Sequence, residues 1–394
     1  MRLNTLSTFI AILAVSAVQA QCDTAQIFNN DSSNAVCIET IDNVITIHTN
    51  NYPDHEWGNW PSGNPVSSQR FSYNVCAYPI KGDSAISMYE NPSERPRCSE
   101  YMIVGVGLNG IFYSGWGAMW FVNPNTMEEN TDWNVEASEM FNMDYNTAHS
   151  NGDGEYHYHG TPYTYYQDDL DIDGTGHSPL IGYTADGFPM YYKYVYSDPL
   201  DSRSEIISIE SGYTLKTGNR PGDGITAPDG AYTGLYVEDY EFTKTSGPVD
   251  DCNGRYGVTP DFPQGTYYYV VTDNWPNFPR CFYGTVLDNS FRIGGGCPES
   301  TADVDCSPAS TNSVEILEGL ELKLYPNPTG NYISIEGQSA VHISQLSIYD
   351  QLGEILYHST TDFQHIDLTS WSVGTYYMQI TAGQTEITRK IIKK

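Results

Sequence analysis

The chain has 394 residues, enough for more than one domain, and carries 49 acidic against 18 basic side chains, a formal net charge of −31 at pH 7. A surface this negative repels nucleic acids and anionic lipids, so we expect neither as a partner. The chain also holds 32 tyrosines and 35 glycines, and few segments show helical apolar spacing. This composition predicts short strands joined by turns in a mostly β protein.

The amino-terminal segment 1–20 predicts a cleaved secretory signal. Arg2 precedes an apolar run from Phe9 to Val18. The small or apolar residues Val18 and Ala20 occupy the positions that a signal peptidase recognises. The run is too short to span a bilayer comfortably, and no later stretch approaches the length of a transmembrane segment. We therefore expect a soluble exported protein.

The cysteines agree with export. None of the eight belongs to a Cys-x-x-Cys zinc pattern, so up to four disulfides are favoured over thiolate metal ligands. Proximity in the sequence favours bonds from Cys22 to Cys37 and from Cys76 to Cys98. The four late cysteines are then expected to pair among themselves: Cys252, Cys281, Cys297 and Cys306.

Three regions follow the signal. Residues 22–297 are rich in Tyr, Gly, Asp and Pro and predict one large β-rich domain with long loops. Residues 298–319 are poor in aromatic residues and rich in Ser, Thr, Glu and Asp, as a linker would be. Residues 320–394 contain alternating apolar runs broken by glycines, which predicts a small β-sandwich.

The last region resembles the carboxy-terminal sorting domain of the type IX secretion system of Bacteroidetes. The matching motifs are Leu324-Tyr-Pro-Asn-Pro328, Tyr349-Asp-Gln-Leu-Gly353, Gly374-Thr-Tyr376 and the basic end Arg389–Lys394. The resemblance implies that the type IX secretion machinery is a partner and that the protein crosses the periplasm and outer membrane. It also implies removal of this domain, followed by release or by attachment at the cell surface.

Two histidines stand two residues apart in Gly154-Glu-Tyr-His-Tyr-His-Gly160, a run with strong β-propensity. Successive side chains on a strand point to opposite faces, so His157 and His159 share one face and Tyr156 and Tyr158 the other. The run therefore predicts half of a metal site.

A dense turn signal over 150–154 predicts a hairpin that brings a third histidine to the same face. The predicted register sets His149 opposite Glu155, so that both converge with His157 and His159. A shift of the register by one residue would turn His149 away.

Two further histidines, His55 and His177, lie in polar, turn-rich segments. Three or four imidazoles suit Zn²⁺ or Cu²⁺, so the sequence predicts a divalent-metal site with these ligands: His149, His157 and His159, helped by His177 or His55. Glu155 or Asp186 as a general base beside metal-activated water would give hydrolysis. A copper ion beside Tyr145, Tyr156 or Tyr158 would instead suit oxidation.

The acidic run Asp169-Leu-Asp-Ile-Asp-Gly174 begins like a calcium loop. Its twelfth position is Leu180, where an EF-hand needs glutamate, so that specific motif fails. Three readings stay open: calcium bound by Asp169, Asp171 and Asp173 in another loop type, a solvated acidic turn, or an aspartate that serves the histidine site.

An internal similarity relates Gly154–Thr161 to Gly265–Thr272, with the glycine, two tyrosines and the final threonine in register. Tyr268 and Val270 stand where the first copy has histidines. If the copies are related, the first carries the chemistry and the second is structural, whereas chance similarity in a tyrosine-rich chain is the alternative.

Residues 44–297 resemble a family of mostly secreted proteins named for its Tyr-His-Tyr-His (YHYH) motif. The matching segments include Asn51–Gly58, Gly105–Gly110, Asn146–His149, Gly154–Gly160, His177–Gly182, Asp186–Tyr191, Asp251–Arg255 and Pro279–Gly284. The resemblance singles out these motif residues: His55, His149, His157, His159, His177 and Asp186. It implies no particular reaction.

Two functions of different class fit these observations. The first is a secreted or cell-surface metal-dependent hydrolase or oxidase acting on an unidentified small molecule or glycan. The second is a non-enzymatic adhesin or glycan-binding protein in which metal or calcium only stabilises loops. In that case a sugar platform could come from four tryptophans that otherwise fill the core: Trp57, Trp60, Trp116 and Trp120.

Overall fold

The computed structural model describes residues 22–58, 60, 64–82, 84–88, 103–115, 119–243, 248–263, 265–287, 289–291, 306, 316–317, 320–337, 343–350, 355–360, 365–382 and 385–394. The predicted signal 1–20 lies outside the described residues, as do most of the predicted linker 298–319, Cys98, Cys297 and Trp116. Within the described ranges, no helix is both long enough and apolar enough to span a bilayer.

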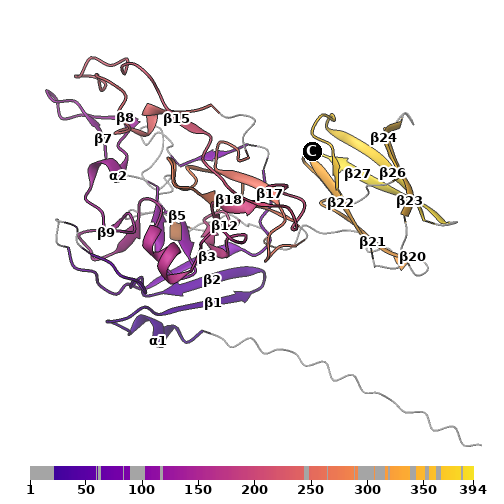
Figure 1. The fold of residues 1–394 in the computed structure, drawn as a ribbon, viewed down its shortest axis with the longest axis horizontal. Coiled ribbons are helices and arrows are strands. Elements are labelled where there is room, and N and C mark those ends of the chain that lie inside the picture. The colour runs from indigo at the N-terminus through magenta and orange to yellow at the C-terminus, as the bar shows by residue number, and fades with distance from the viewer. Residues whose placement is uncertain are drawn as a thin grey trace, which may run out of the picture.

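The fold is mostly β, as predicted, and short helical segments only connect strands (Figure 1). In the described residues the helical segments are α1 (Thr24–Phe28), α2 (Ala137–Met140), η2 (Tyr165–Asp169), η3 (Val237–Asp239) and η4 (Asn289–Phe291). An antiparallel three-stranded sheet opens the chain with β1 (Val36–Ile41), β2 (Val44–Thr49) and β3 (Phe71–Cys76).

The central sheet of the large domain has eight strands. Their order in space is β17 (Gly254–Gly257), β18 (Thr266–Val271), β12 (Pro189–Tyr192), β11 (Leu180–Thr184), β5 (Ile103–Gly107), β6 (Phe112–Ser114), β10 (Tyr156–Tyr158) and β9 (Ala148–Ser150). The large domain also contains two-stranded sheets: β7 (Trp120–Val122) with β8 (Glu129–Asn134), β13 (Tyr194–Tyr196) with β14 (Ile206–Ser208), β15 (Tyr213–Leu215) with β16 (Tyr240–Phe242), and β19 (Cys281–Phe282) with β4 (Ile86–Ser87).

The carboxy-terminal region forms the predicted β-sandwich, drawn in orange and yellow in Figure 1. One sheet has the order β20 (Ile316–Leu317), β21 (Leu320–Tyr325), β22 (Tyr332–Gly337), β25 (His365–Asp367), and the other β24 (Ile355–Ser359), β23 (Ile343–Tyr349), β26 (Gly374–Ala382), β27 (Thr385–Lys393). Ile333 and Ile366 from the first sheet pack with Leu346 and Met378 from the second in one buried core. The alternation in the sequence places these apolar side chains on the inner faces.

The eight-stranded sheet repeats one topology twice along the chain. In the first half β5 pairs antiparallel with β6, β6 runs parallel to β10, and β10 pairs antiparallel with β9. In the second half β11, β12, β18 and β17 are connected by the same three kinds of pairing. The antiparallel β5–β11 pair joins the halves. The similar segments 154–161 and 265–272 therefore contribute the corresponding strands, β10 and β18.

Hydrogen bonds recur at corresponding places in the two halves. Leu108 N–H donates to Ile181 O at 2.9 Å, and the corresponding Ala185 N–H donates to Val104 O at 2.8 Å. Buried tyrosine hydroxyls recur as well: Tyr156 donates to Asp144 (2.7 Å) as Tyr267 does to Asp250 (2.8 Å). At the other pair the direction is reversed, because Tyr158 accepts from Asn109 Nδ2 (3.0 Å) whereas Tyr269 donates to Asp186 (2.8 Å). Such agreement supports a duplicated unit over chance tyrosine richness.

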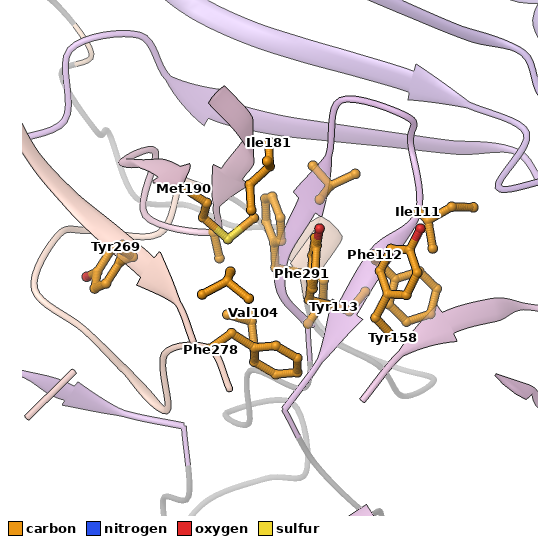
Figure 2. Packing of buried hydrophobic residues seen from close by; sticks show 14 of the residues in the cluster. Val104, Ile111, Phe112, Tyr113, Tyr158, Ile181, Met190, Tyr269, Phe278 and Phe291 are labelled. Carbon is orange, nitrogen blue, oxygen red and sulfur yellow. The ribbon is translucent and has the colours of Figure 1, made fainter. Parts of the chain in front are cut away.

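One hydrophobic core runs under both halves of the sheet. Figure 2 shows Tyr158 and the corresponding Tyr269 towards opposite sides of this core, with Val104 and Met190 between them. Both tyrosine rings are fully buried, which is why their hydroxyls need the polar partners described above. The core is thus built from aromatic rings whose polar ends are satisfied.

Three disulfides join described cysteines. The Cys22–Cys37 bond confirms the prediction, and Cys252–Cys281 is one bond among the late cysteines. The predicted Cys76–Cys98 bond is wrong, because Cys76 at the end of β3 is bonded to Cys306, 230 residues later. For the same reason the prediction that the four late cysteines pair only among themselves is wrong for Cys306. Sequence proximity failed here because the fold returns the chain to the first sheet after the central sheet is complete.

The centre of the sheet admits no side chain at Gly182. A Cβ atom there would collide with Val106 O and lie 2.9 Å from Gly107 Cα, both backbone atoms of β5. We expect Gly182→Ala to lower the free energy of unfolding by about 2 kcal/mol, since β5 and β11 would have to separate. Urea unfolding measures this. Gly152→Ala is the control, because its Cβ meets nothing within 4 Å, and equal stability of the two variants would contradict the packing argument.

Candidate metal centre

The β9–β10 hairpin brings three histidines to one face at an edge of the central sheet. His149 lies directly opposite His157, and His159 N–H continues the ladder by donating to Thr147 O at 2.8 Å. The predicted pairing of His149 with Glu155 is wrong by two residues. The turn is centred one residue later than predicted, because the strands pair through Ser150 with Tyr156 and Asn151 N–H bonds Glu155 O beyond them. A shift of two residues preserves the face, so the convergence holds.

The three imidazoles present one ligand atom each within 4.8 Å of one another. His149 Nε2 and His159 Nε2 lie 3.2 Å apart, and the ring centroids of His157 and His159 are separated by 4.6 Å. Nitrogen atoms at about 2 Å from a common zinc ion are roughly 3 to 3.5 Å apart in a tetrahedral site, so small side-chain adjustments would suffice. Among the described residues, this is the one convergent group made entirely of histidines.

The remaining ring nitrogens are held by the backbone. His157 Nδ1 donates to Glu155 O at 2.9 Å, and His159 Nδ1 donates to Ser114 O at 3.1 Å. Because each Nδ1 carries the proton, each Nε2 keeps its lone pair. Histidine ligands of metal ions are oriented by this kind of second hydrogen bond.

Burial keeps the cluster neutral. Desolvation and, to a smaller extent, the neighbouring His149 lower the pKa of His157 to about 3, against the opposing effect of its bond to Glu155 O. Burial also lowers the pKa of His159, and the charges of His157, His149 and Arg280 act in the same direction. The pKa of His149 is lowered by burial, although Asp144 opposes this. Neutral imidazoles are the form that binds metal ions.

Aromatic rings and one buried ion pair surround the histidines. Phe112 stacks on His157 with ring centroids 5.1 Å apart, and Phe141 packs against His149 at 5.4 Å. Arg280 forms a buried ion pair with Glu136 at 3.1 Å. Sequence reasoning missed this pair, because its members are 144 residues apart, and the only available signal was the position of Arg280 in the motif segment 279–284.

His55 does not join the cluster. Its Nε2 lies 2.6 Å from the hydroxyl of Tyr158, and its ring lies 4.9 Å from that of Tyr165. Tyr158 points to the face of β10 opposite to His157 and His159, so His55 lies on the wrong side of the sheet to be a ligand. Its second nitrogen bonds Glu56 O at 2.9 Å, which makes it a hydrogen-bonded core histidine.

His177 and Asp186 belong to the second half of the sheet. His177 packs against Tyr191 and Tyr196 with ring centroids 5.1 and 4.7 Å away. Asp186 lies in the β11–β12 turn, where its carboxylate accepts bonds from Thr184, Tyr269 and the Gly284 N–H. Because β5 and β6 separate β11 from β10, the proposed catalytic role of Asp186 at the histidines is not supported.

Glu155 is adjacent to the cluster but faces another partner. Its carboxylate accepts a bond from Asn151 Nδ2 at 2.7 Å and is not among the converging ligand atoms. The three aspartates of the predicted calcium loop form no convergent group within the described chain: Asp169, Asp171 and Asp173. Asp173 instead caps its own turn by accepting bonds from Thr175, so the solvated acidic turn is the better reading.

Other candidate ligands have structural roles. Two further clusters among the described residues contain cysteines: Cys22 with Glu39 and His48, and Cys252 and Cys281 with Asp251. All three cysteines form disulfides, so they cannot bind metal as thiolates. Trp60 and Trp120 are buried, and Trp57 stacks on Trp60, so these described tryptophans fill the core rather than form an exposed sugar platform.

The fold and the cluster define a mostly β protein with a group of three converging histidines at a sheet edge. The profile of the YHYH protein family matches residues 87–284, which is half of the chain, and the chain belongs to this family. The profile of the secretion system C-terminal sorting domain matches residues 323–394. This domain indicates secretion or display at the cell surface and implies that the type IX secretion machinery is a partner. No curated protein matches the chain.

The neutral histidines make the metal-free protein acid-sensitive. Unfolded histidine takes up a proton near pH 6.5, whereas folded His157 does so only near pH 3, so stability is lost as pH falls through this window. We expect about 2 kcal/mol less free energy of unfolding at pH 5 than at pH 7 from this residue alone, measured by urea unfolding with chelator.

The variant His157→Gln should show a weaker dependence of stability on pH. Gly152→Ala in the same hairpin provides the control, since it changes no titratable group and should keep the dependence of the unchanged protein. Equal pH dependence in His157→Gln and the unchanged protein would show that burial does not keep His157 neutral.

Proposed function

We propose that His149, His157 and His159 bind a divalent transition-metal ion, with zinc or copper as the best candidates, and that this centre is the functional site of the secreted protein. The observation that carries the proposal is the convergence of three ligand nitrogens within 4.8 Å. Two of the rings are preoriented by backbone carbonyls, and burial holds all three neutral. An all-imidazole ligand set matches ions of intermediate softness.

The position of the cluster supports an open coordination site. His157 and His159 are only 6% and 3% exposed, but His149 is half-buried on the edge strand β9. Solvent therefore reaches the cluster from the side of His149. Three protein ligands with a fourth position open to water are typical of catalytic zinc centres, whereas structural centres use four protein ligands.

Hydrolysis is the reaction that the surroundings favour. An ion with an open position activates water at neutral pH without a protein base, which suits a site where neither Glu155 nor Asp186 is in place. Oxidation through a neighbouring tyrosine is less favoured, because Tyr156 and Tyr158 point to the opposite face and bond Asp144 and Asn109. The buried tryptophans argue against the adhesin alternative, so we place a metal-dependent hydrolase first.

Metal content tests the site directly. The purified protein should contain about one zinc or copper ion per chain, and His157→Ala/His159→Ala should contain less than about a tenth of that, because two of three ligands are lost. Elemental analysis after extensive dialysis measures both. His177→Ala is the matched control and should keep its metal. Metal-free unchanged protein, or equal metal in the double variant, would refute the site.

Cobalt substitution tests the open position. The visible spectrum of the Co²⁺-loaded protein should shift when azide is added, since an exogenous ligand can occupy a free coordination position. A closed structural centre would give no shift. The outcome separates a catalytic centre from a loop-stabilising one, and His157→Ala/His159→Ala should show neither the cobalt spectrum nor the azide response.

A further inference from the structure

The second half of the central sheet has a counterpart of the histidine cluster at its opposite edge. In β9 and β10, His149 pairs with His157, and in the corresponding strands Arg255 pairs with Tyr268. Val270 occupies the place of His159, and its N–H donates to Asn253 O at 2.8 Å as that of His159 donates to Thr147 O. The second half therefore keeps the strand pairing of the first, but Arg255, Tyr268 and Val270 stand where the first half has His149, His157 and His159.

Four polar atoms at this counterpart are buried and have no hydrogen-bond partner in the described part of the chain. They are Arg255 Nη1, Tyr268 Oη, His177 Nε2 and Ser178 Oγ. Arg255 is 8% exposed and Tyr268 is fully buried. Unsatisfied buried polar atoms are rare in folded proteins, and those of Arg255, Tyr268 and His177, which lie close to one another, indicate a common missing partner.

These side chains lie close to one another. Arg255 is directly opposite Tyr268 on the neighbouring strand, so both point to the same face. The His177 ring is 6.2 Å from that of Tyr268, and the Arg255 charge contributes to lowering the pKa of His177. The same charge opposes the burial that raises the pKa of Tyr268 to about 12.

Arg255 differs from the other buried arginines. Arg220 forms an ion pair with Asp239 at 2.6 Å, and Arg280 forms one with Glu136 at 3.1 Å. Arg255 has no carboxylate within ion-pair distance among the described residues, and burial lowers its pKa. A buried charge without a partner is costly, so it is usually kept for a ligand.

The nearest acidic groups have other partners. Asp198 influences Arg255 electrostatically, but its carboxylate accepts a bond from Leu200 N–H. Asp261 influences His177, and its carboxylate accepts the hydroxyl of Tyr191 at 2.9 Å. Neither neutralises the guanidinium by direct contact.

We propose that Arg255, Tyr268 and His177 form a binding site for a small ligand that carries a carboxylate or sulfate group next to a hydroxyl group, as hydroxy acids and acidic sugars do. Arg255 and Tyr268 donate hydrogen bonds to the anionic group. His177 Nδ1 donates to Ser178 O at 2.8 Å, so His177 Nε2 is an acceptor and takes the ligand hydroxyl. The half-buried His177 and Tyr196 connect the site to solvent. This site is independent of the histidine centre.

Isothermal titration calorimetry of the full exported protein, in a chelator without carboxylate groups and an oxyanion-free buffer, tests the proposal with acetate, glycolate and sulfate. We expect binding of glycolate or sulfate, and glycolate severalfold more tightly than acetate because of its hydroxyl group. Arg255→Met should weaken binding at least about tenfold, since a charge-assisted bond is lost. Tyr268→Phe should weaken it severalfold, and His177→Phe should abolish the preference for glycolate over acetate.

Two controls keep the outcome clear. Arg203→Met removes an exposed arginine and should bind as the unchanged protein does, and so should His157→Ala/His159→Ala, which separates this site from the metal centre. In oxyanion-free buffer Arg255→Met should be at least as heat-stable as the unchanged protein, because no native contact of the charge is lost. Absence of binding of all three anions, or equal affinity in Arg255→Met, would overturn the proposal, as would a lower melting temperature of Arg255→Met in oxyanion-free buffer.

Discussion

The close contact between β5 and β11 at the centre of the sheet is the constraint on which the rest of the structure depends. Gly105 approaches the backbone of Tyr183 and Thr184, and Gly182 approaches Val106 and Gly107 in the reciprocal way. At these two positions the halves of the sheet meet through backbone, because a side chain at either glycine would push them apart. This contact makes one continuous core possible, and it sends β9 and β17 to the two opposite edges.

The edges are where the two halves have diverged. The interior positions keep a tyrosine that bonds a carboxylate or an amide, and the pairs Tyr158–Asn109 and Tyr269–Asp186 show how little this pattern changes. Burial raises the pKa of Asp186, and its three hydrogen-bond donors oppose that shift, so the carboxylate serves the turn and the tyrosine. The buried tyrosines of the sheet interior thus have a structural role. The two edges differ, because one carries three imidazoles and the other carries Arg255 with Tyr268.

The sequence predicted the mostly β fold, the sandwich and the face shared by His149, His157 and His159, because strand alternation depends only on local geometry. It did not predict the exact hairpin register, since the Asn151–Glu155 hydrogen bond centres the turn one residue later than the glycine pattern indicated. Proximity of motif residues along the chain was a poor guide to the ligands. His55 and His177 stand in similar segments, but sheet order places them on another face and in another half. The Cys76–Cys306 bond was equally invisible, because only tertiary structure brings its ends together.

That disulfide would also determine what is left if the sorting domain is removed, as the resemblance to sorting domains implies. Cys306 lies between the last described residues of the YHYH domain and the first strands of the sorting domain, and it is bonded to the end of β3. A proteolytic cut after Cys306 that removes the sorting domain leaves the new carboxy-terminus tethered to the amino-terminal sheet. The remaining chain would then have a second disulfide beside Cys22–Cys37 on that sheet. Extracellular carboxypeptidases would therefore meet a carboxy-terminus that is covalently held to the fold.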